Sequence, residues 1–384
     1  ELAKSSIAQS DRFVPCYRRI VVKLGTNLLT GGSNHLDLEV MASLVGQMAR
    51  LHHRGLELIV VSSGAMAAGR HKLGMSNTHK GVHFRQVLAS VGQSRLMNAY
   101  EQLFGWHSIT VAQALLTKPD LTDRAGYLNT RNTLLALVEL RVICIVNEND
   151  VVAVDELEET RFGDNDNLSA MVANLVDADL LLILSDIEGL FTADPHLDPN
   201  ARLIPRVECI NSDVECLAGA STGERGIGGM ATKIEAARLA TASGVSVVIA
   251  HGREPDVLAR VAAGESIGTL FPTAATKMES RKRWLLSGLS ARGSLVGDDG
   301  ATAAVKEKTR SLLPAGIREV KGEFQRGDTV NILDAHGQRI AYGIANYSSE
   351  ALARIKGLRS DGIAQALGYD YGDEAVHRNN LAVL

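Results

Sequence analysis

The sequence has few of the residues that mark metal, disulfide or membrane proteins. Its four cysteines, Cys16, Cys144, Cys209 and Cys216, show no Cys-x-x-Cys spacing, so reduced thiols are expected rather than zinc ligands or disulfides. No apolar run reaches the roughly 18 residues that a membrane-spanning helix needs. The net charge is −4 with both signs dispersed, which argues against binding to nucleic acid or to a membrane surface by charge. We therefore expect a globular, cytoplasmic protein without a metal site of its own.

Hydrophobic periodicity predicts an α/β domain over residues 18–275. Short, near-continuous apolar runs alternate there with helical patterns, as in a three-layer αβα sandwich whose helices cover both faces of a mainly parallel central sheet. The expected strands are 20–24, 58–61, 109–115, 142–146, 180–184 and 245–250. Residues 1–11 lack the basic and then apolar order of a signal peptide, and residues 1–17 are expected to be a disordered leader.

A second, smaller domain is expected after a linker over residues 276–290. Glycine is frequent and the helical pattern largely stops, which predicts a β-rich domain over 291–369 followed by a tail over 370–384. The expected strands are 305–308, 317–320, 329–333 and 339–344.

Polar residues follow several expected strands of the first domain. They include Lys23, Ser63, Asp150, Ser185 and Asp186. Each residue alone could merely cap a helix or shape a turn. In open α/β sheets, however, ligands bind outside the carboxyl ends of the strands, so these segments are expected to converge on one site.

The glycine-rich segment 226–233 is the strongest phosphate-binding candidate. Its glycines let backbone N–H groups approach an anion, a helical pattern follows, and Lys233 would lie at the start of that helix. The segment is not a Walker A motif, because its lysine follows Thr232 rather than a glycine. A plain structural turn is the alternative.

Two further features favour phosphate chemistry. Lys23 closes an apolar strand, where a lysine is costly to bury unless it meets an anion, although a surface lysine with a buried stem is the alternative. In the polar segment 162–168, Asn167 could cap a helix, whereas Asp164, Asn165 and Asp166 could bind an amino group or hold lysines.

Six ordered segments resemble motifs of the amino acid kinase family, and within it the branch that phosphorylates glutamate at the start of proline biosynthesis. They are Val-Lys-Leu-Gly-Thr-Asn at 22–27, Val-Ser-Ser-Gly-Ala at 61–65, Val-Asn-Glu-Asn-Asp at 146–150, Gly-Asp-Asn-Asp-Asn at 163–167, Gly-Leu-Phe-Thr-Ala-Asp-Pro at 189–195 and Gly-Gly-Met-Ala-Thr-Lys at 228–233. The C-terminal region is similar to a PUA domain.

The resemblance implies a role for each matching residue. Lys23 and Lys233 would bind the ATP phosphates and stabilise the transition state, with Asp166 orienting both lysines. Ser63, Asp150 and Asn165 match glutamate-binding positions, and Asp164 lies beside them. The ATP site would comprise Lys23, Ser185, Asp186, Ile227, Gly228, Gly229, Met230, Ala231, Thr232 and Lys233. Mg²⁺ would arrive with ATP, proline would inhibit by feedback, and the chain would form a dimer or tetramer.

The expected reaction is an in-line attack by the γ-carboxylate of glutamate on ATP. A carboxylate is already ionised at neutral pH, so no catalytic histidine is needed. One residue departs from the family pattern: Ile227 stands where threonine is usual, but the backbone donors survive, so we expect activity to remain.

Two alternatives stay open. One is another amino acid kinase acting on acetylglutamate, aspartate, carbamate or UMP. The other is an RNA-binding accessory protein that works through the C-terminal domain. Residues 291–384 carry 12 Lys and Arg against 12 Asp and Glu, which is not the basic surface that RNA binding requires. The lysine pair also has no purpose in a protein that only binds RNA.

Overall fold

The computed structural model describes residues 15–75, 81–152, 165–195, 197–220, 229–273, 291–308 and 310–384. They form two compact units. The first contains the described residues up to Leu115 together with Leu137–Thr241 and Val245–Thr273, and the second contains those of Leu116–Ala136, Ala242–Gly244 and Ala274–Leu384. The linker expected over 276–290 and most of the expected leader lie outside the described residues.

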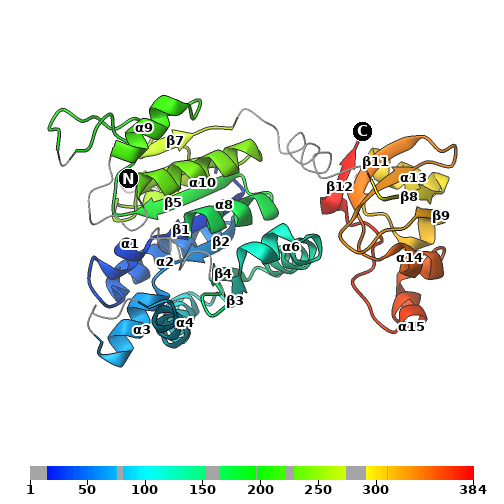
Figure 1. The fold of residues 1–384 in the computed structure, drawn as a ribbon, viewed down its shortest axis with the longest axis horizontal. Helices are drawn as coiled ribbons and strands as arrows, with labels where there is room; N and C mark the ends of the chain where they lie inside the picture. Colours follow the sequence, from blue (N-terminus) through cyan, green and yellow to red (C-terminus); the bar gives the residue numbers. More distant parts are fainter. Residues whose placement is uncertain are drawn as a thin grey trace, which may run out of the picture. The chain divides into compact units, whose positions relative to one another are not determined.

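A seven-stranded sheet forms the centre of the first unit (Figure 1). Its strands are β1 (Arg19–Leu24), β2 (Glu57–Ser62), β3 (Val111–Leu116), β4 (Ile143–Glu148), β5 (Leu180–Ser185), β6 (Ser246–His251) and β7 (Thr269–Phe271), in the order β3-β4-β2-β1-β5-β6-β7. β1 pairs in parallel with β2 and β5, β2 with β4, and β5 with β6, whereas β7 runs antiparallel to β6. The mainly parallel sheet predicted from the apolar runs is confirmed.

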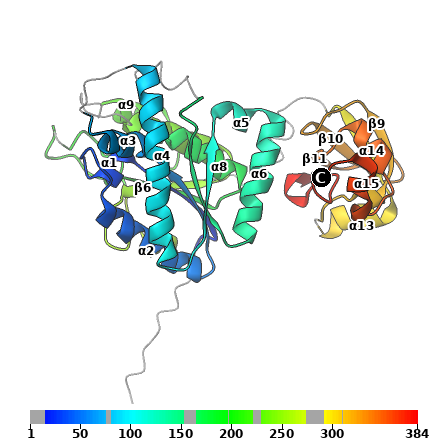
Figure 2. The same cartoon turned by 90° about the horizontal axis from the view of Figure 1, so that it is seen from below.

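Helices cover both faces of this sheet. The helices of this unit are α1 (Thr26–Thr30), α2 (Leu38–His53), α3 (Ala65–Leu73), α4 (Val82–Gly105), α8 (Asp166–Leu175), α9 (Ser212–Ala220), α10 (Met230–Ala242) and α11 (Val257–Ala262), whereas α5 (Lys118–Thr122) and most of α6 (Arg124–Glu139) belong to the second unit. α2, α4 and α11 share one buried apolar cluster with the sheet, while α8 contacts β1 and β5 and lies with α10 on the opposite side (Figures 1 and 2). β5 is buried along its whole length, as its continuous apolar run predicts for a strand covered on both faces.

The parallel strands end at one edge of the sheet. β1, β2, β4 and β5 finish at Leu24, Ser62, Glu148 and Ser185. Each chain segment that leaves this edge carries polar residues of the predicted site, so the sheet brings together residues that are far apart in the sequence.

The C-terminal unit contains a smaller sheet with the order β12-β11-β10-β8-β9. Its strands are β8 (Gly293–Gly297), β9 (Ile317–Gly322), β10 (Thr329–Leu333), β11 (Arg339–Ile344) and β12 (Leu381–Val383). The helices are α13 (Asp299–Lys308), α14 (Ser349–Ile355) and α15 (Ile363–Leu367), with short 3₁₀ turns at Pro314–Gly316, Ser360–Gly362 and Arg378–Asn380. The sheet and helices share one buried apolar cluster.

One expected strand of this unit is wrong. Residues 305–308 lie in α13 rather than in a strand. Val305 is fully buried in the apolar cluster, and Ala301, one helical turn earlier, packs against the same cluster. Burial at helical spacing therefore overrides the β preference of a branched side chain. The helical pattern accordingly does not stop at the first domain.

Candidate active site

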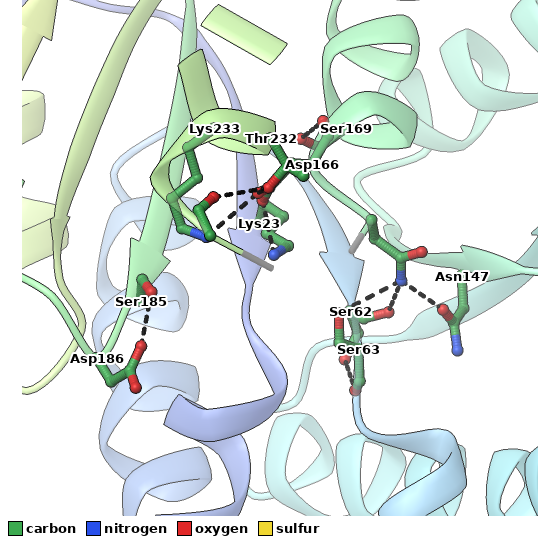
Figure 3. A network of polar contacts seen from close by, with 12 residues as sticks. Lys23, Ser62, Ser63, Asn147, Asp166, Ser169, Ser185, Asp186, Thr232 and Lys233 are labelled. Carbon is green, nitrogen blue, oxygen red and sulfur yellow. Dashed lines mark hydrogen bonds and ion pairs between the residues drawn. The ribbon is translucent and has the colours of Figure 1, made fainter. Parts of the chain in front are cut away.

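Two lysines share one carboxylate at the carboxyl edge of the large sheet. Lys23 Nζ on β1 lies 2.7 Å from Asp166 Oδ1, and Lys233 Nζ on α10 lies 3.3 Å from Asp166 Oδ2 (Figure 3). Relative exposure is 1% for Lys23, 2% for Lys233 and 0% for Asp166. Together these three groups carry one net positive charge, which suits an anionic ligand because buried charge is costly unless it is neutralised.

The start of α10 adds a polar contact to this group. The Thr232 hydroxyl lies 3.0 Å from Asp166 Oδ2 and 2.8 Å from the carbonyl oxygen of Gly229. Gly229 immediately precedes the helix, and Met230 is its first residue. The segment that was predicted to hold phosphate therefore ends at the buried lysine pair.

A second polar network surrounds Asn165, directly before α8. Its Nδ2 lies 2.7 Å from the carbonyl oxygen of Ser62, 2.7 Å from Asn147 Oδ1 and 3.5 Å from Ser63 Oγ. Asn147 Nδ2 in turn donates to Gln93 Oε1 at 2.7 Å. The Asn165 nitrogen faces protein acceptors. Its carboxamide oxygen is therefore the atom that can accept a hydrogen bond from a ligand.

A pocket opens beside this network. Its walls comprise Thr26, Ser63, Gly64, Ala65, Met66, Ala67, Asn147, Glu148, Asp150 and Asn165. The first three residues of α3 form one wall, and Gly64 before them has φ +99°, a conformation that favours glycine. This N-terminus has no side-chain cap, so its N–H groups and dipole suit a carboxylate. Glu148 and Asp150 on another wall suit an ammonium group.

Ser185 and Asp186 lie at the end of β5. Ser185 Oγ donates to Asp186 Oδ1 at 2.9 Å, and Asn27 Nδ2 donates to Asp186 Oδ2 at 3.0 Å. Burial by itself would raise the pKa of Asp186, but these hydrogen bonds, one from its own backbone and the charge of Lys233 outweigh burial and lower that pKa. Asp186 is therefore an ionised hydrogen-bond acceptor.

The predicted residues fall into three groups within the described part of the chain. Lys23, Asp166, Thr232 and Lys233 meet at one point, Ser63, Asp150 and Asn165 line the pocket, and Ser185 and Asp186 follow β5. Gly229, Met230 and Ala231 occupy the start of α10, where Met230 is buried and Ala231 exposed. Asp164, Ile227 and Gly228 lie outside the described residues.

Several polar residues of the site were not predicted, including Glu148 of the pocket wall. Asn27 and Asn147 fall within motifs that were recognised, but no contact could be assigned to them from the sequence. Gln93 and Tyr100 come from α4, and the Tyr100 hydroxyl lies 2.7 Å from Ser62 Oγ. Spacing along a helix gives no sign that a side chain will reach a strand end, so these two could not have been found from local sequence.

Comparison with known proteins agrees with this geometry. The model of the amino acid kinase family matches residues 18–251, and that of the PUA domain matches residues 293–367. The chain is 58% identical over 369 residues to a protein of Dehalococcoides mccartyi, covering 96% of this chain and 99% of that protein. It is 52% identical to a protein of Shewanella oneidensis, covering 96% of this chain and 98% of the relative.

The fold and the paired lysines define a phosphotransferase of the amino acid kinase type. The chain belongs to the amino acid kinase family and carries a C-terminal PUA domain. The two relatives, and a Herpetosiphon aurantiacus protein that is 51% identical over 95% of this chain and 98% of its own length, are named glutamate 5-kinase. The predicted family and fold class are confirmed.

Across the residues that the structure describes, no helix is long and apolar enough to cross a membrane. In the same residues, no group of three or more His, Cys, Asp or Glu side chains is placed to hold a metal ion.

Proposed function

We propose that the chain transfers the γ-phosphoryl group of ATP to the γ-carboxylate of L-glutamate, yielding L-glutamyl 5-phosphate and ADP. This reaction is the first step of proline biosynthesis. The buried Lys23–Asp166–Lys233 group carries the proposal, because a transferring phosphoryl group spreads negative charge over its oxygens and needs fixed cations. The high identity to proteins named glutamate 5-kinase supports the choice of substrate.

The chemistry needs positioning more than proton transfer. A γ-carboxylate oxygen of glutamate forms a bond to the γ-phosphorus, the bond from that phosphorus to the β,γ-bridging oxygen breaks, and ADP leaves with the electron pair. No proton moves, since the nucleophile is already ionised. Lys23 and Lys233 neutralise the charge that shifts toward the bridging oxygen, and Asp166 keeps both ammonium groups at that point.

The pocket beside the lysines suits an amino acid. The N-terminus of α3 offers N–H donors to a carboxylate, while Asp150 and the carboxamide oxygen of Asn165 accept from an ammonium group. Ser63 lies between them as a hydroxyl donor or acceptor. Asp164, next to Asn165 in the sequence, is expected to add a second carboxylate on the ammonium side.

ATP is expected to lie over the opposite side of the lysine pair. Ser185 and Asp186 would contact its nucleoside part, and the backbone from Ile227 to Lys233 would contact its phosphates. Mg²⁺ would be held by the phosphates themselves, which is the usual arrangement for nucleotide-bound magnesium. Feedback inhibition by proline, a dimeric or tetrameric state and action in the cytoplasm belong to the same proposal.

A substrate panel tests the proposal. ADP release is measured with glutamate, acetylglutamate, aspartate, carbamate and UMP as acceptors, each with and without proline. We expect release that depends on glutamate and falls when proline is added. Equal or faster release with another acceptor would overturn the choice of substrate while leaving the kinase assignment standing.

A further inference from the structure

Asn27 links the two strands that carry the nucleotide side of the site. It lies on α1, which begins two residues after β1 ends, and Asp186 directly follows β5, the neighbour of β1 in the sheet. Asn27 Nδ2 donates to Asp186 Oδ2 at 3.0 Å, and Ser185 Oγ donates to Oδ1 at 2.9 Å. Each oxygen of the carboxylate thus has a donor that fixes its direction.

The backbone around Asn27 is anchored on both sides. The N–H of Gly25 donates to the carbonyl oxygen of Leu184 at 3.1 Å, which ties the start of α1 to β5. The N–H of Gly31, whose φ of +59° favours glycine, donates back to the carbonyl oxygen of Asn27. The Asn27 carboxamide is therefore presented to Asp186 by a fixed backbone, although the residue itself is exposed.

Stability does not account for this contact. A hydrogen bond between exposed side chains contributes little to folding, because water replaces either partner when the bond breaks. The contact instead restricts a carboxylate that accepts hydrogen bonds and lies near Lys233, whose charge acts on it. An oriented acceptor at this place is of use to a ligand rather than to the fold.

We propose that Asn27 is a positioning residue of the nucleotide site, which holds the Asp186 carboxylate in the orientation that accepts hydrogen bonds from the nucleoside. A carboxylate can only accept, and a triphosphate at neutral pH offers it no donor, whereas ribose hydroxyls and an exocyclic amino group do. The inference rests on the proposed kinase function and names which part of ATP the Asn27–Asp186 pair recognises.

Binding measurements on the full chain test this inference. Dissociation constants for ATP, and for tripolyphosphate as a probe of the phosphate half alone, are measured by calorimetry for wild type, Asn27→Ala and Asn27→Asp. Asn27→Ala is expected to weaken ATP binding by about tenfold, the loss typical of a hydrogen bond to a charged group, and to leave tripolyphosphate binding within about twofold. Asn27→Asp is expected to weaken ATP binding further, since two carboxylates would then face each other.

Asn34→Ala is the matched control, because Asn34 is an exposed asparagine in the loop after α1. It is expected to bind ATP like wild type. Melting temperatures of all variants are expected to agree, because Asn27 is exposed. An unchanged ATP dissociation constant in Asn27→Ala, or an equal loss for tripolyphosphate, would overturn the inference.

A double-mutant cycle tests whether Asn27 acts through Asp186. In an Asp186→Ala background, Asn27→Ala is expected to have less than a twofold further effect on ATP binding. The same tenfold loss in both backgrounds would show that Asn27 acts independently and would overturn the inference. If the wild type binds ATP and phosphorylates glutamate but Asn27→Ala leaves the ATP dissociation constant unchanged, only the inference about Asn27 is overturned. A wild type that binds no ATP would overturn both proposals.

Discussion

Lys23 Nζ lies 2.7 Å from one oxygen of the Asp166 carboxylate, and both residues are buried, with relative exposures of 1% and 0%. The other oxygen lies 3.3 Å from Lys233 Nζ. One carboxylate thus orients two ammonium groups that come from strands and helices distant in the sequence. Such an arrangement places positive charge before substrate arrives, so that little reorganisation is needed during phosphoryl transfer.

Removing either ammonium group is expected to abolish most turnover. Lys23→Ala and Lys233→Ala should each lower kcat for glutamate-dependent ADP release by on the order of 10²-fold or more, as for other transition-state donors. Lys72→Ala, which removes an exposed lysine from α3, is the control and should leave kcat unchanged. Near-normal turnover in both site variants would contradict the mechanism.

Neutralising Asp166 is expected to destabilise the fold. Asp166→Asn keeps the shape but leaves two buried ammonium groups facing an amide, and breaking a buried ion pair typically costs about 3–5 kcal/mol. Chemical denaturation measures this loss. Tripolyphosphate should restore more stability to the variant than to wild type, because it supplies the missing negative charge. Unchanged stability of Asp166→Asn would show that the lysines do not depend on this carboxylate.

Asp150 is expected to act on glutamate and not on ATP. Asp150→Ala removes a carboxylate from the pocket wall and should raise the KM for glutamate several-fold, while the dissociation constant for ATP stays the same. Glu101→Ala, at an exposed position of α4, is the matched control. The idea fails if the glutamate KM of Asp150→Ala equals that of wild type.

The crossing of α3 and α4 leaves no room for a side chain at Gly92. A Cβ there would lie 1.7 Å from the carbonyl oxygen of Ala65 and 2.4 Å from the nitrogen of Gly69. Gly92→Ala should therefore destabilise the protein by about 3 kcal/mol or more and raise the glutamate KM, since Ala65 begins the pocket wall. Denaturation midpoints and glutamate kinetics measure the two effects.

Gly105→Ala, at the end of the same helix, is the control for Gly92→Ala. A Cβ at Gly105 meets no atom within 4 Å among the described residues, so this substitution should be neutral or stabilise the helix by up to about 1 kcal/mol. If the two alanine variants have the same stability, close packing of α3 and α4 does not make a glycine necessary at position 92.

His52 is expected to make stability fall in mild acid. Burial, followed by the charge of Arg141, lowers the pKa of His52 from 6.5, and its Nε2 lies 3.1 Å from the carbonyl oxygen of Arg141. The unfolded chain therefore binds a proton more readily, so folding stability should decline as the pH falls through 6.5 toward the lower folded-state pKa. Below that folded-state pKa the loss is complete and does not grow.

His52→Gln should remove this part of the pH dependence. Free energies of unfolding for wild type and variant are compared between pH 7.5 and about 5. His53→Gln, the exposed neighbour, is the control and should retain the wild-type slope. An identical slope in His52→Gln would exclude His52 as the source.

The sequence predicts most strands of the first unit, because strands that are buried on both faces appear as continuous apolar runs. The run at β5 is apolar throughout, and residues after β1, β2, β4 and β5 must meet once the strands are parallel. The grouping of Lys23, Asp166 and Lys233 follows from that topology together with the family resemblance.

Other features depend on tertiary contacts that local sequence does not encode. Val305 has a side chain typical of strands, but its burial against the small sheet places it in α13. Two side chains of α4, Gln93 and Tyr100, meet Asn147 on β4 and Ser62 on β2 only in the folded chain. Asn27 meets Asp186 because β1 and β5 are neighbours in the sheet although far apart in the chain.

We propose that ATP phosphorylates the γ-carboxylate of glutamate at the Lys23–Asp166–Lys233 group. The most direct test of this proposal is to incubate the enzyme with ATP, Mg²⁺, L-glutamate and hydroxylamine, which traps an acyl phosphate as a hydroxamate, and to identify the product by mass spectrometry. We expect γ-glutamyl hydroxamate in amounts equal to the ADP formed, and its loss in Lys233→Ala. The α-hydroxamate, or ADP release without any hydroxamate, would contradict the account.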